Sequence, residues 1–103
     1  MFDYPGYARI GGAWSVGSDS HVTRAWAEEL RLLEYSQRLT RRQRNVAAQT
    51  SAQTSSASAL LEAALRGGRS ATALPLGTIE VGHRADFVAL DTDTPALLGV
   101  PTD

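Results

Sequence analysis

Four consecutive polar residues, Ser18, Asp19, Ser20 and His21, follow a short apolar stretch that ends at Gly17. A carboxylate such as Asp19 can ligate a divalent metal or accept a proton from water. Ser18 and Ser20 could orient that carboxylate through hydrogen bonds, and His21 could be a ligand, a proton shuttle or a substrate contact. Ser-Asp-Ser is also ordinary turn chemistry, because short polar side chains bond nearby backbone N–H groups. The local pattern leaves both a turn and the rim of an active site open.

A metal centre needs more ligands than this cluster offers. Zinc sites use three or four protein ligands, and the chain has two histidines and no cysteine. The second histidine, His83, falls in a predicted hairpin turn, where we expect exposure to solvent rather than ligation. These residues are therefore not expected to assemble a complete metal site on their own.

Length and charge narrow the class of protein. The 103 residues suffice for one domain at most. A net charge of −1 does not point to nucleic acid or to an anionic membrane surface as a partner. No apolar run approaches the ~20 residues of a spanning helix, and the first residues lack the pattern of a secretory signal. We therefore expect a soluble, cytoplasmic protein.

The first half of the chain predicts one short strand and one long helix. Residues 1–12 contain proline and glycines and indicate an irregular lead-in. Residues 13–16 have the alternation of a strand. Thr23 is a suitable N-cap for an amphipathic helix beginning near Arg24. Its apolar positions recur at helical spacing, with Trp26, Leu30 and Leu33 on one stripe that Leu32, Tyr35 and Leu39 are expected to widen. Residues 13–46 thus form one predicted unit of strand and helix.

The second half predicts a linker, a helix and a hairpin. Residues 47–57 have low complexity and no large apolar side chain, which is typical of a mobile linker. A helix is expected from about Ser58 to Arg66, with Gly67 as its stop. Alternation around Ile79 and a run at 87–90 indicate a β-hairpin, so 58–93 is a second unit. The tail, 94–103, is expected to fray. The isolated chain is thus predicted to be α+β.

Two stretches carry a resemblance to a known family. "GGAWSVGSDSHVTRAWAEELRLLEYSQRL" resembles the last barrel strand and following helix of metal-dependent amidohydrolases, and more narrowly the formimidoylglutamate deiminases, which share G-S-D-S-H-V and E-E-L-R-x-L-E-Y. "GTIEVGHRADFVALD" is similar to the C-terminal signature of that superfamily, within its flanking β-sandwich. Together the matches cover roughly residues 11–93. They imply a C-terminal piece of a (β/α)8 amidohydrolase barrel plus a hairpin of the β-sandwich.

This resemblance implies a reaction and a role for one residue. Asp19 corresponds to the aspartate that binds the catalytic metal, usually zinc, and helps to deprotonate the attacking water. The implied reaction converts a small molecule of histidine degradation, N-formimino-L-glutamate, to N-formyl-L-glutamate and ammonia. The family's His-x-His pair, its later metal-binding histidine and its acid/base Glu and His would all lie upstream. The chain alone is therefore expected to be inactive and to bind no zinc.

Two other functions stay open on the sequence. One is another amidohydrolase, acting on a purine or triazine ring. The other is a non-catalytic α+β module that self-associates, since a strand separated from its sheet has two exposed edges. The expected partners are a second copy of the chain or the missing barrel portion, and neither nucleic acid nor a membrane.

Overall fold

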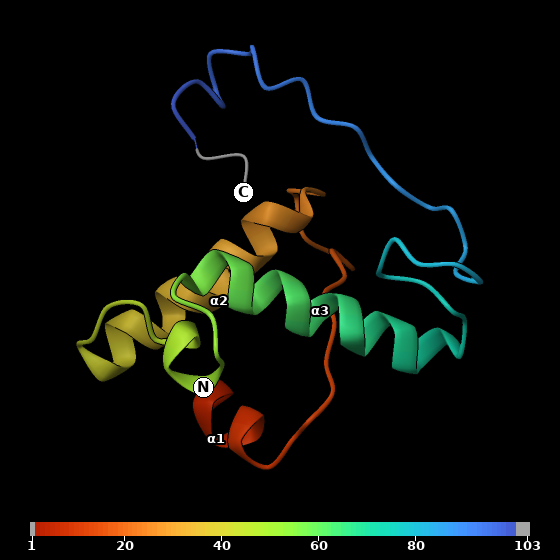
Figure 1. Ribbon diagram of the computed structural model, residues 1–103. Helices are drawn as coiled ribbons and strands as arrows, with labels where there is room; N and C mark the ends of the chain where they lie inside the picture. Colours follow the sequence, from red (N-terminus) through yellow and green to blue (C-terminus); the bar gives the residue numbers. More distant parts are fainter. Residues whose placement is uncertain (1, 101–103) are drawn as a thin grey trace.

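The computed structural model describes residues 2–100, which form helices joined by irregular segments (Figure 1). The helices are, in chain order, α1 (Tyr4–Arg9), α2 (Trp26–Arg41), the 3-10 helix η1 (Ala47–Thr50) and α3 (Ser56–Thr72). The helix η1 contacts both α1 and α3, and α2 contacts α3. A small apolar core lies among these four helices. Its buried members are Tyr4, Leu30, Ala47, Ala59, Leu60 and Ala64.

The predicted α+β fold is wrong, because residues 2–100 contain no strand. Neither the expected barrel strand at 13–16 nor the expected β-sandwich hairpin at 79–90 forms. A strand needs a neighbour for its backbone N–H and C=O groups, and an isolated two-stranded hairpin is marginal in water. Residues 13–16 run extended but pack on the helical core through Trp14 and Val16. Residues 79–90 form a turn and irregular chain.

The long amphipathic helix is confirmed as α2. Leu30 is buried and Leu33 packs against the core. Acidic residues lie in the first turn and arginines in the last, as favoured by the helix dipole. The helix starts at Trp26, after Ala25, whose side chain makes no cap hydrogen bond. The predicted cap at Thr23 is therefore not used.

Two buried polar side chains of α2 hold the neighbouring segments in place. The carboxylate of Glu34 accepts hydrogen bonds from the backbone N–H groups of Val46, at 2.9 Å, and Ala47, at 3.0 Å. The amide of Gln37 accepts one from the N–H of Tyr4, at 3.3 Å, and donates one to the carbonyl of Phe2, at 2.8 Å. Buried polar groups are tolerated when paired in this way. One helix thus fixes both the start of the chain and η1.

The segment predicted as a mobile linker, 47–57, has regular structure at both ends, since residues 56 and 57 already belong to α3. Residues 47–50 form η1, and Ala47 is fully buried. These residues have no large apolar side chain. Alanine can still fill a narrow space between helices, and Glu34 supplies acceptors for the backbone there. The small side chains are what allows the close packing.

The other two helices also differ from the sequence expectation. The lead-in contains α1, which is capped by the Asp3 side chain accepting from the N–H of Gly6. Helix α3 does not stop at Gly67 but continues to Thr72 and ends in the left-handed Ala73, at φ 55°. Of the predicted tail, residues 95–99 form turns, and 101–103 lie outside the described residues.

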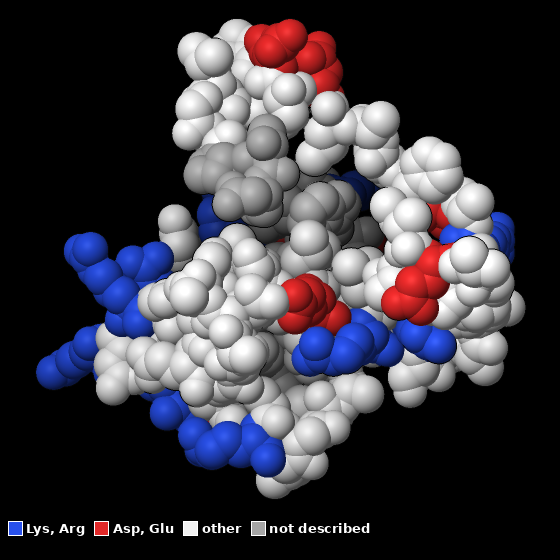
Figure 2. Space-filling model, in the orientation of Figure 1, with Lys and Arg blue, Asp and Glu red and all other residues white. Residues whose placement is uncertain are grey.

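Arginine side chains gather over the C-terminal end of α2, at the left edge of the view in Figure 2. Arg41, the last residue of α2, forms an ion pair with Asp3. The pKa of Asp3 lies below its usual value because its carboxylate accepts the Gly6 N–H and is bonded by the Arg41 guanidinium.

Over the part of the chain described, no helix is long and apolar enough to cross a membrane.

Candidate functional site

The Ser18–His21 segment is a turn on the surface. The N–H of His21 donates to the carbonyl of Ser18 at 2.6 Å. Asp19 has a left-handed backbone, at φ 40°, which short polar residues adopt more readily than most. Asp19, Ser20 and His21 are exposed, and Ser18 is half-buried. Residues 18–21 therefore form a turn that leaves the side chains of Asp19, Ser20 and His21 on the surface.

The carboxylate of Asp19 makes no hydrogen bond or ion pair with any residue in the described range. Neither Ser18 nor Ser20 orients it through a side-chain bond. No group of three or more His, Cys, Asp or Glu residues able to hold a metal occurs between residues 2 and 100. Because zinc needs three or four ligands, the residues present do not fit a metal ion by themselves.

The His21 side chain contacts the first turns of α2. Its Nδ1 lies 2.9 Å from Oε1 of Glu29. That oxygen is buried and accepts no hydrogen bond from the described groups. Its contact with His21 is an ion pair only when the imidazole is protonated. From the sequence, Glu29 could be identified only as an acidic residue near the start of the helix. Its contact with His21 depends on the path of residues 22–25, for which the sequence carries no signal.

The second histidine is more enclosed than predicted. The His83 side chain is 11% exposed, although its turn was expected to leave it in solvent. Its Nδ1 lies 2.6 Å from the hydroxyl oxygen of Thr78, and its Nε2 lies 3.6 Å from a Glu80 carboxylate oxygen. Its backbone N–H also closes a turn onto the carbonyl of Glu80, at 3.1 Å. These contacts fix the local loop and do not bring His83 to Asp19.

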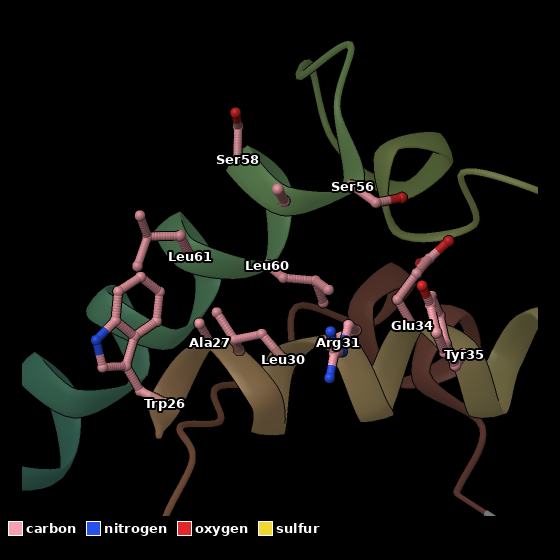
Figure 3. Close-up of a pocket in the computed structure, with 11 residues that line it drawn as sticks. Trp26, Ala27, Leu30, Arg31, Glu34, Tyr35, Ser56, Ser58, Leu60 and Leu61 are labelled. Carbon is pink, nitrogen blue, oxygen red and sulfur yellow. The ribbon is translucent and has the colours of Figure 1, made fainter. Parts of the chain in front are cut away.

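An apolar groove of about 460 Å³ lies between α2 and α3. In Figure 3, Trp26 reaches from α2 toward Leu61 of α3, and Leu60 points down toward Leu30. Glu34 and Tyr35 lie at the other end. The groove offers shape and apolar contact, but its one buried carboxylate, that of Glu34, is already bonded to backbone. It is therefore a surface for packing rather than a site for acid–base chemistry.

Comparison with known proteins gives one clear relative. No protein-family model and no solved structure matches the chain. All 103 residues match a curated formimidoylglutamate deiminase from Pseudomonas aeruginosa, with 44% identity, and span 22% of its length. That coverage is consistent with a C-terminal segment. The chain is therefore homologous, over its whole length, to about a fifth of a formimidoylglutamate deiminase, which confirms the family resemblance read from its motifs.

Proposed function

We propose that this chain is part of a metal-dependent amidohydrolase that hydrolyses N-formimino-L-glutamate in the cytoplasm. The observation that carries the proposal is the 44% identity, across every residue of the chain, to an enzyme named formimidoylglutamate deiminase. In the proposed reaction, water adds to the formimino carbon and a new C–O bond forms. The C–N bond to the terminal nitrogen breaks, ammonia leaves, and N-formyl-L-glutamate remains.

Asp19 is the residue of this chain that we assign to the reaction. Its carboxylate is exposed and unpaired within the described structure, so its oxygens are available to accept a proton from water or to bind a cation. Zinc is the metal that the motif resemblance implies. The other ligands would come from sequence that these 103 residues do not contain. The weaker assignments, Ser18, Ser20 and His21, are contacts to substrate or to Asp19.

The relative favours this substrate over the rings of purine or triazine aminohydrolases, because its name specifies formimidoylglutamate. A small non-catalytic module is the remaining alternative. It differs from the first proposal in one measurable respect, since it predicts no turnover even when the rest of a deiminase is supplied.

The test is a hybrid enzyme: the P. aeruginosa deiminase with its matching segment replaced by these 103 residues. We expect ammonia release from N-formimino-L-glutamate by the hybrid and none by the 103-residue chain alone. Asp19→Asn in the hybrid should lower kcat by at least ~100-fold, the scale of a lost proton acceptor. Asp93→Asn, at an exposed carboxylate far along the chain, is the matched control and should leave kcat unchanged. A folded hybrid without turnover would refute the proposal.

A further inference from the structure

Helix α2 carries apolar side chains on two opposite faces. Leu30 and Leu33 face the core. Leu32, Tyr35 and Leu39 are 52%, 50% and 80% exposed. At 100° per residue, these three form one stripe on the far side of the helix; we call it the outer stripe. A helix with only one buried face has polar residues on the opposite face. The outer stripe is apolar instead, as expected for a helix face that another part of a protein covers.

The chain also has a larger accessible surface and a larger radius of gyration than a compact domain of its size. Its accessible surface is 7976 Å², against about 5,600 Å² for a folded monomer of this mass. Its radius of gyration is 14.7 Å, against about 13 Å for a compact domain of this length. The excess of about 2,400 Å² belongs to the whole chain, because side chains after α3 such as Ile79, Val81 and Phe87 are exposed as well as those of the outer stripe. The outer stripe is one of the exposed apolar surfaces that another body can cover.

The outer stripe continues to the candidate site. A hollow of about 310 Å³ is lined by Leu32 and Tyr35 of the stripe and by His21 of the turn. Arg31 and Glu28, at the rim of the hollow, pair with each other. Arg38 lies over the Tyr35 ring, 5.3 Å from its centroid, and has no acidic partner within the described range. A body covering the stripe would therefore be apolar, with an acidic group opposite Arg38.

We propose that the outer stripe docks against the part of a deiminase chain that these residues do not contain. The inference rests on the proposed function. The relative has about four fifths of its length outside the match, which is enough polypeptide to cover such an area. Docking there places the rest of the enzyme beside His21 and the turn that displays Asp19. The missing catalytic groups would then approach the candidate site across this contact.

The test compares the same substitutions in two settings. Leu32→Glu with Leu39→Glu is introduced into the 103-residue chain and into the hybrid enzyme, and thermal unfolding is measured in both. In the free chain the pair should leave the midpoint nearly unchanged, because both side chains lie in solvent. In the hybrid it should lower the midpoint by several degrees, because two carboxylates would be buried. Gln43→Glu, at an exposed position just after α2, is the control and should change neither.

Three results would overturn the docking proposal. The first is a hybrid whose unfolding is indifferent to the pair. The second is a hybrid that does not fold even with the stripe intact, since the face should then fit its partner. The third is a free chain that forms a dimer, loses the dimer when Leu32→Glu and Leu39→Glu are introduced, and gives a hybrid whose unfolding midpoint does not change with the same pair. That result would assign the stripe to a second copy of the chain. A stable hybrid that is sensitive to the pair but releases no ammonia would support docking and refute the proposed function.

Discussion

The carbonyl oxygen of Trp14 lies 1.7 Å from the position that a Cβ atom would occupy at Gly67. The extended segment before the candidate site thus runs directly over α3, in contact with its backbone. Trp14 also packs edge-to-face on the buried Tyr4, at 5.5 Å between ring centroids. This crossing places residues 13–16, and with them the turn that follows, on the helical core.

Gly67→Ala should therefore destabilise the chain, by about 1–3 kcal/mol, because backbone must move to admit a methyl group. Gly68→Ala is the matched control: its Cβ would meet only the Ser15 hydroxyl oxygen, at 3.6 Å. It should stabilise α3 by about 0.5–1 kcal/mol through helix propensity. Urea unfolding followed by circular dichroism measures both. Equal gains from the two substitutions would show that the crossing is absent.

Glu34→Ala should cost about 2–4 kcal/mol, because the N–H groups of Val46 and Ala47 would stay buried without acceptors. Glu34→Gln keeps one acceptor oxygen and should cost less. Glu28→Ala removes a carboxylate from an exposed pair on the same helix and should change stability by less than ~1 kcal/mol. Hydrogen exchange at residues 46 and 47 should accelerate only in the Glu34 variants. Unchanged protection there would contradict the assignment.

The pKa of Asp3 gives a pH dependence with a definite sign. Because the Gly6 N–H and Arg41 hold this pKa below its ordinary value of 3.8, the ionised form is favoured in the folded state. Its stabilising contribution is complete above the ordinary pKa and is lost as pH falls through the lowered one. Asp3→Asn retains a capping side chain and should flatten the stability profile below about pH 4. Parallel profiles for the two proteins would exclude this contribution.

Substitutions of Asp19 can separate a structural role in the turn from a role in the candidate site. Its backbone is left-handed and its carboxylate bonds to no described residue, so Asp19→Gly should raise the stability of the free chain by up to about 1 kcal/mol. Asp19→Asn should leave stability unchanged. A loss of stability in the asparagine variant, measured by urea unfolding, would mean that the carboxylate serves the turn itself.

The sequence predicted those features that depend on local periodicity. The positions of Leu30 and Leu33 indicated α2 and part of its buried face, and the short polar residues indicated the turn at 18–21. The expectation that Leu32, Tyr35 and Leu39 widen that face was wrong, because these side chains are exposed. Strands could not be predicted in the same way, because alternation at Ile79 specifies a strand only where a neighbouring strand exists. Both Ile79 and Val81 are almost fully exposed instead.

The contacts around the candidate site depend on irregular segments in which the chain changes direction. The amino-acid composition of such segments does not predict their path. The approach of His21 to Glu29 spans an irregular segment. The hydrogen bonds that the N–H groups of residues 46 and 47 donate to Glu34 join the segment after α2 back to that helix. Polar side chains on the buried face of an amphipathic helix were the available signal, since such groups need partners when they are buried.

Because Ala47 is buried, the first residues of the low-complexity segment 47–57 should tolerate fewer substitutions than the residues that follow them. At this position every larger side chain would have to push α1 or α3 aside, because alanine already has no accessible surface. Ser51 and Ala52, only a few residues later, face solvent. Among homologous sequences, substitutions should therefore accumulate after Thr50 and be nearly absent at 47, although both parts are equally simple in composition.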